Sequence, residues 1–174
     1  MSTGRSDAER PYAVGAAAGF LAWLVGYVLT YLLTATELDD SALNAFIQLA
    51  EGESATYELV GWVFYNAHFV DVRYTVLLFL LPPLLLFAAG LAVGRYRGSA
   101  DTAEGAVTGA LVLPGYLVLS VAGVFLFKVT VGNASGRPDL LAAIVLAGFL
   151  YPAVFGAVGG VVVAATTDER SVLS

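Results

Sequence analysis

Four long apolar runs dominate this chain and constrain what it can fold into. They cover residues 13–35, 74–94, 105–131 and 140–165. A helix needs about 20 predominantly apolar residues to cross the hydrocarbon core of a bilayer, and each run is long enough. The first run is longer than the apolar core of a signal peptide, so we expect it to be a retained helix. The sequence therefore predicts an all-α integral membrane four-helix bundle, formed by one domain of residues 1–174.

The composition excludes several classes of functional site. Hydrophobic residues make up 59% of the chain and charged residues 13%, whereas soluble domains average about 25% charged. With no cysteine and one histidine, a disulfide framework, a thiolate metal site and a multi-histidine metal site within one chain are excluded. No catalytic or nucleotide-binding motif is present, and the few basic residues are not clustered. We therefore expect no catalytic residue, no metal, no cofactor and no nucleic-acid partner.

Residues 36–72 form the longest polar interval, and their pattern predicts a helical insert between the first two spans. Leu43, Phe46, Ile47 and Ala50 recur with the spacing of an amphipathic helix. A second helix is predicted from about residue 54. Residues 59–69 are apolar and aromatic but too few to span, so the segment is interfacial, buried or re-entrant. The sequence leaves these alternatives open.

The second half of the insert, GWVFYNAHFVDVR at residues 61–73, carries the densest group of polar side chains. His68 and Asp71 are three residues apart, which places them on one face of a continuous helix. Such a pair can act as a general base or a proton relay, or it can be a hydrogen-bonded pair that fixes the approach to span two. Asp71 and Arg73 are either a gating or ligand-binding ion pair or ordinary charges that flank a helix.

The same segment predicts an aromatic helix face. Trp62, Tyr65 and Phe69 recur at i, i+3 and i+7, with Asn66 close to that face. His68 is expected on another face. If the insert is an assembly element, this aromatic face contacts lipid, a second copy of the chain in a homo-oligomer, or another membrane protein.

Two further features concern the spans themselves. Lys128 is the one charge within an apolar run, near its end, so it either reaches the outer headgroups or pairs with a carboxylate of the insert. Glycines recur at spacings that allow helix backbones to approach closely. We expect them to serve helix packing: Gly15, Gly19, Gly26, Gly90, Gly94, Gly156 and Gly160.

Basic residues near the span ends predict the orientation in the cell membrane. If the N-terminus is cytoplasmic, the inner side carries five basic residues and the outer side three: Arg5, Arg10, Arg95, Arg97 and Arg170, against Arg73, Lys128 and Arg137. Cytoplasmic loops are enriched in lysine and arginine. We therefore expect a multi-pass protein with both termini cytoplasmic and the insert outside.

The YNAHFVDV stretch after a Gly-Trp pair, with Tyr151-Pro152 and later glycines in the fourth span, resembles uncharacterised small four-span membrane proteins of halophilic archaea. The net charge of −6 is typical of such organisms. The resemblance implies the four-span fold and no assigned activity. We expect a non-catalytic structural or accessory membrane subunit; the alternative is a small ion or solute transporter or channel gated near His68, Asp71 and Arg73.

Overall fold

The computed structural model describes residues 4–68, 76–99 and 101–172, with side chains described for residues 12–68, 76–99 and 101–167. Within these residues, four helical stretches are long and apolar enough to cross a membrane: Tyr12–Asp39, Val76–Arg97, Thr102–Leu126 and Leu140–Thr167. The predicted all-helical fold with four packed apolar helices, and shorter helices between the first two, is confirmed.

The first half of the chain forms span one, the insert and span two. Its elements are α1 (Gly4–Asp39), α2 (Ala42–Glu51), α3 (Thr56–Asn66) and α4 (Val76–Arg97). The second half forms spans three and four with a hairpin between them. Its elements are α5 (Thr102–Ala110), α6 (Leu113–Leu126), β1 (Val129–Val131), β2 (Ala134–Gly136), α7 (Leu140–Ala142), the π-helices η1 (Ala143–Leu150) and η2 (Pro152–Gly156), and α8 (Ala157–Val172).

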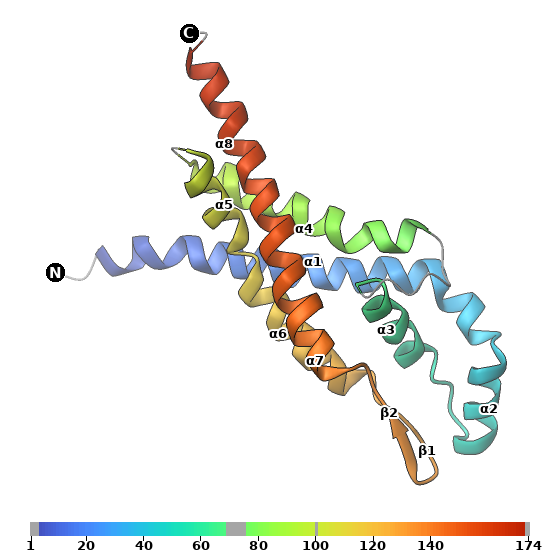
Figure 1. The fold of residues 1–174 in the computed structure, drawn as a ribbon. Helices are drawn as coiled ribbons and strands as arrows, with labels where there is room; N and C mark the ends of the chain where they lie inside the picture. Colours follow the sequence, from blue (N-terminus) through green and yellow to red (C-terminus); the bar gives the residue numbers. More distant parts are fainter. Residues whose placement is uncertain (1–3, 69–75, 100, 173–174) are drawn as a thin grey trace.

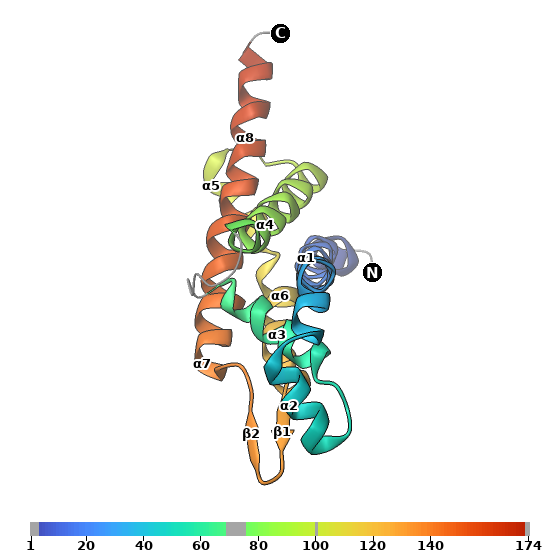
Figure 2. The same ribbon diagram turned by 90° about the vertical axis from the view of Figure 1, so that its right-hand side faces the viewer.

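The elements outside the spans gather at two ends of the bundle. In Figure 1 the N-terminal end of α1 lies at the left and the C-terminal end of α8 at the top, with the end of α4 and the start of α5 between them, whereas α2 and the β-hairpin lie toward the lower right. Figure 2 shows α1 nearly end-on while α8 stands upright, so these two spans cross at a wide angle. The hairpin is antiparallel, with Thr130 opposite Ser135. We refer to the end with α2 and the hairpin as the insert end.

The third span departs from the sequence prediction in two ways. Its helix is interrupted between Ala110 and Leu113, just before Pro114, which has no amide hydrogen to donate to the preceding turn. It also ends at Leu126 rather than at residue 131, because Val129–Val131 forms a strand. The predicted range of 105–131 was therefore wrong at its C-terminal end, where an apolar strand continued the apolar helix.

Close backbone contacts hold the spans together. A Cβ built on Gly19 would lie 1.8 Å from the Val112 carbonyl oxygen, and one on Gly115 would lie 1.8 Å from that of Ala16. The same holds between spans two and four, where a Cβ on Gly90 would lie 2.1 Å from the Gly156 carbonyl oxygen. Because no side chain separates these helices, α1 packs directly on α6, and α4 packs directly on η2 and α8.

A cluster of rings fills the centre of the bundle at the insert end. Phe127, at the end of α6, stacks on Trp23 and Tyr27 of α1, with ring centroids 6.1 and 5.0 Å apart. Phe64 of α3 meets Trp23 edge-on at 5.2 Å. Both Phe64 and Phe127 are fully buried. The core therefore joins α1, α3 and α6, and the insert is part of it.

Candidate functional site

The site is organised by α3, and the loop before α3 is held in place by polar contacts with α1 and α2. Asn44 of α2 is 1% exposed, and its side-chain oxygen accepts a hydrogen bond from the Ala55 amide at 2.8 Å. The Thr56 hydroxyl donates to the Asp39 carboxylate at 2.6 Å. These bonds start α3 against the end of α1, and the helix then runs back into the bundle (Figure 1).

The face of α3 that carries Tyr65 points inward. Tyr65 is 2% exposed and its hydroxyl donates to the Ser120 carbonyl of α6. Trp62 is half-buried, and its indole nitrogen donates to the Phe127 carbonyl at 2.7 Å. The expectation that this aromatic face contacts lipid or a partner was therefore wrong for Tyr65, whereas Trp62 keeps part of its surface exposed. Phe69, the third member of the face, lies outside the described residues.

Contacts with three of the spans show how far α3 extends into the bundle. Phe64 lies against Gly26, close to the middle of the first span, Tyr12–Asp39. His68 contacts Tyr116 and Tyr151, which lie close to the middle of the third and fourth spans. The insert therefore re-enters the bundle to about its mid-depth, and His68 lies at the inner end of that re-entry.

His68 is 2% exposed, and both of its ring nitrogens have partners. Nδ1 lies 3.0 Å from the Phe64 carbonyl oxygen, and Nε2 lies 2.8 Å from the Tyr116 hydroxyl. A carbonyl only accepts, so Nδ1 carries the hydrogen and Nε2 accepts from Tyr116. His68 lies outside the four spanning segments, and desolvation by burial lowers the pKa of its imidazole, although hydrogen bonds with the Phe64 and Tyr65 backbone oppose this. The arrangement favours a neutral imidazole.

The surroundings of His68 are aromatic and uncharged among the described side chains. None of the buried polar residues among all the described side chains is an acid, a lysine or an arginine. They are Thr30, Thr34, Asn44, His68, Thr108 and Ser120. Nε1 of Trp23 and Oγ of Ser120 are buried with no hydrogen-bond partner among the described residues. The sequence did not single out Tyr116. A mid-span tyrosine two residues after Pro114 was the available signal, since its hydroxyl needs a partner there.

Of the other predicted polar residues, Asn66 and Lys128 lie within the part of the chain that the structure describes. Asn66 is half-buried at the end of α3, whereas Asp71 and Arg73 lie outside the described residues. Lys128 is exposed and follows the end of α6, so it lies outside the spanning helix. It lines a pocket of about 230 Å³ with carboxylates of the insert, Glu51, Glu53 and Glu58. Of the two roles expected for Lys128, this position beside carboxylates of the insert favours pairing over a reach to the outer headgroups.

Each of the seven packing glycines lies close to another part of the chain. Gly15 and Gly19 face the break between α5 and α6, and Gly26 faces the Phe64 ring. The remaining four meet across spans two, three and four: Gly90 and Gly94 of α4, Gly156 at the end of η2 and Gly160 of α8.

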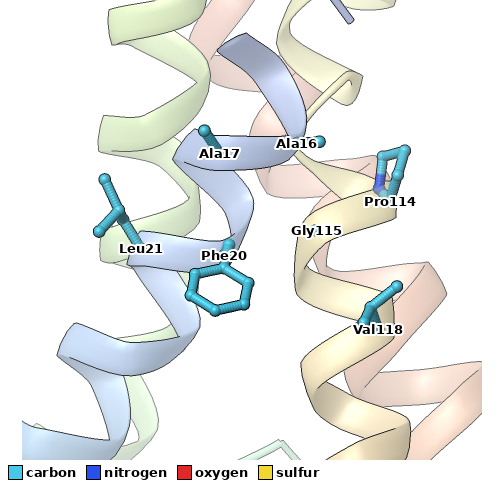
Figure 3. A pocket seen from close by; sticks show the side chains of 7 residues that line it. All are labelled: Ala16, Ala17, Phe20, Leu21, Pro114, Gly115 and Val118. Carbon is cyan, nitrogen blue, oxygen red and sulfur yellow. The ribbon is translucent and has the colours of Figure 1, made fainter. Parts of the chain in front are cut away.

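A second hollow lies between α1 and α6, away from His68. It measures about 570 Å³, and Figure 3 shows its lining of apolar side chains: Ala16, Ala17, Phe20, Leu21, Pro114, Gly115 and Val118. Phe20 and Leu21 are 41% and 58% exposed on a spanning helix. A surface of this kind offers room for acyl chains but carries no group that could do chemistry.

Comparison with known proteins places most of the chain in one family. The sequence profile of a family of unknown function, DUF7978, matches residues 1–77 and 73–167. Searches of curated proteins and of solved structures returned no significant match. Within its described residues the chain has four helices suited to crossing a membrane, which are the features of a multi-pass membrane protein. With both parts of the match covering most of its length, the chain belongs to the DUF7978 family.

Proposed function

We propose that the chain is a non-catalytic accessory subunit of a membrane assembly, and that it contacts its partner through α2. The supporting observation is an apolar face on this helix: Leu43, Phe46 and Leu49 are 53%, 59% and 87% exposed. Figure 1 places α2 past the end of α1, with the β-hairpin. Apolar side chains gathered on a surface outside the spans are typical of contact sites.

The structure of α2 makes its exposed face a fixed feature. Ser41 caps its first turn by accepting a hydrogen bond from the Asn44 amide at 3.1 Å, and Gly52 ends it in the left-handed conformation. Ile47, on the inner side, is 4% exposed. Because the inner side is anchored, Phe46 and Leu49 are held outward, so a partner that binds them does not have to order the helix.

The test compares two double variants during purification of the native protein in mild detergent. Phe46→Ser with Leu49→Ser removes the apolar face, whereas Ala45→Ser with Gln48→Ser changes exposed positions outside it. If this face supplies about 2 kcal/mol of association, the first variant should lose partner or self-association by roughly 30-fold. The control should retain it. Equal association in both variants, with both folded, would rule out α2 as the contact.

A second candidate is the small transporter or channel gated near His68. The observation that favours it is the group of hydrogen-bonding atoms at mid-depth, where polar groups often mark a transport path. Here His68 and Tyr116 would bind a permeating proton or small polar solute. The measurement is flux into reconstituted vesicles for the wild type, His68→Gln and Tyr116→Phe. A pH-dependent flux that both variants abolish, with assembly intact, would replace the accessory role.

For localisation, we propose the cell membrane with both termini cytoplasmic and the insert outside. The support is the basic pair Arg95 and Arg97 in the last turn of α4, on the same side as the termini in Figure 1. The acidic composition favours a halophilic source. Stability should therefore increase when salt is raised, since screening weakens repulsion among the carboxylates.

A further inference from the structure

A groove of about 570 Å³ lies at the insert end of α1, apart from both His68 and the outer face of α2. Tyr31, Thr36 and Asp39 of α1 line one side, and Thr56 and Tyr57 of α3 line the other. Asp39 is the last residue of the first candidate span, so the groove lies at the insert end of that helix. Ligands that reach it include both dissolved molecules and lipid headgroups.

The Asp39 carboxylate is held in a fixed position by neutral donors. Its Oδ1 accepts from Thr56 Oγ1 at 2.6 Å, from Ser54 Oγ at 3.3 Å and from Asn44 Nδ2 at 3.3 Å. Asn44 is almost fully buried, which fixes the donor from α2. Among the described side chains, no basic group forms an ion pair with this carboxylate. Its negative charge is therefore oriented but not neutralised.

Two tyrosines place aromatic surface beside this charge. Tyr31 is 40% exposed and Tyr57 44% exposed, and both line the groove. Tyr27 supports them: its ring lies 5.5 Å from that of Tyr57, edge to face, and its hydroxyl donates to the Tyr57 carbonyl at 3.2 Å. Aromatic faces attract cations, most strongly weakly hydrated organic ones.

The charge of the insert end would also draw cations toward the groove. The described residues of 36–68 and 128–139 contain seven acids and two basic residues: Glu37, Asp39, Asp40, Glu51, Glu53, Glu58 and Asp139, against Lys128 and Arg137. An excess of one sign raises the local concentration of the opposite ion. A metal ion is a poor match for this groove, since no group of three or more His, Cys, Asp or Glu suited to a metal occurs among the described residues.

We infer that this groove binds an organic ammonium group, with its charge against Asp39 and its carbon substituents against Tyr31 and Tyr57. A carboxylate provides the countercharge, and the rings bind the alkyl groups that a hydrated metal ion lacks. The chemistry is shared by choline or ethanolamine in solution and by lipid headgroups that carry them. This site does not depend on the role proposed for α2, and either can fail without the other.

The test uses the full chain in a maltoside detergent, whose headgroup has no ammonium, with choline as the probe. Saturation-transfer NMR measures binding to the wild type, Asp39→Asn and Asp40→Asn. Asp39→Asn keeps an oxygen that accepts from Thr56 but removes the charge, and we expect it to weaken binding at least tenfold. Asp40→Asn removes the same charge one residue outside the groove lining, and we expect less than a twofold effect.

A second pair of variants tests the aromatic contribution. Tyr57→Phe keeps the ring and should bind choline as the wild type does, whereas Tyr57→Leu should weaken binding several-fold. Tyr57→Leu also loses the ring contact with Tyr27, so its melting temperature should fall, and all variants are compared at a temperature at which each is folded. No binding by the wild type, equal losses for the two aspartate variants, or wild-type binding by Tyr57→Leu would each overturn the inference.

The source of the ammonium group is decided in nanodiscs. If lipid headgroups are the natural occupant, discs made with choline-headgroup lipid should bind added choline much more weakly than discs made with phosphatidylglycerol. If free solute is the occupant, the two discs should bind added choline equally. In either case the Asp39→Asn variant should lose binding in the phosphatidylglycerol discs. Retained binding by that variant there would overturn the site.

Discussion

Two glycines on one helix allow the packing of the bundle to be tested with a matched pair of substitutions. Gly90 and Gly94 lie one turn apart on α4, so Gly→Ala gives each the same gain in helix propensity, about 0.5–1 kcal/mol. Their surroundings differ. A Cβ at position 90 would lie 2.1 Å from the Gly156 carbonyl oxygen, whereas one at position 94 would lie 3.3 Å from the Gly160 Cα.

The expected difference follows from how far each neighbour must move. For Gly90→Ala, the two helices must move apart until the distance from the new Cβ to the Gly156 carbonyl oxygen grows from 2.1 Å to at least 3.0 Å. A backbone oxygen cannot turn aside as a side chain does. Overpacking of this kind costs about 1–3 kcal/mol, which exceeds the propensity gain. Gly94→Ala needs a shift of only a few tenths of an ångström and should be close to neutral.

The assay is thermal unfolding of both variants in the same detergent. We expect Gly90→Ala to melt several degrees below Gly94→Ala, because 1 kcal/mol corresponds to about 2–4 °C for a chain of this size. A Gly90→Ala variant as stable as Gly94→Ala would show that α4 and η2 do not pack backbone to backbone, and the arrangement of spans two and four would have to be revised.

The orientation of the insert and its contacts with the spans can be tested by three further experiments. Single cysteines at Glu53 and Ala103 should differ toward an impermeant thiol reagent on intact cells, with only Glu53→Cys labelled; the reverse result would invert the orientation. Burial lowers the pKa of His68, so its contribution to stability is present above its ordinary pKa of 6.5 and is lost as the pH falls below that value. The melting temperature of the wild type should therefore drop more between pH 7 and pH 5 than that of His68→Gln. Equal drops would contradict a buried neutral imidazole. Trp62→Phe loses the hydrogen bond to the Phe127 carbonyl and should cost about 0.5–1.5 kcal/mol, read as a lower melting temperature; an unchanged temperature would show that this bond does not anchor α3.

The spans were predictable because apolar length is a direct requirement of the bilayer. The fourth span was predicted at residues 140–165 and is found at Leu140–Thr167. The second was predicted at residues 74–94 and is found at Val76–Arg97. The third span failed at its end for a physical reason: Val129–Val131 is as apolar as the helix before it, and hydropathy does not distinguish a helix from a strand. The turn at Gly132, where φ is 57°, was the local signal that the chain reverses.

The depth of α3 was not predictable from its own residues. An 11-residue apolar helix satisfies the requirements of an interfacial, a buried or a re-entrant segment equally well. Which one it adopts depends on partners far away in sequence, such as Tyr116 for His68 and the Ser120 carbonyl for Tyr65. The same dependence explains why the aromatic face was expected outside: its periodicity identifies a face, but not the neighbour that covers it.

Three glycines explain how the four spans make room for the aromatic rings around α3. A Cβ on Gly26 would lie 2.9 Å from the Phe64 ring, one on Gly123 would lie 2.5 Å from the Tyr65 hydroxyl, and one on Gly61 would lie 2.1 Å from the Phe127 ring. They come from α1, α6 and α3, so each of these three elements has a glycine where it lies against an aromatic side chain of another element. Glycine in this chain therefore serves two kinds of contact: span against span along α4 and α8, and ring against backbone where α3 enters. The second kind places the only histidine at mid-depth, because α3 could not approach α1 and α6 this closely if those positions carried side chains.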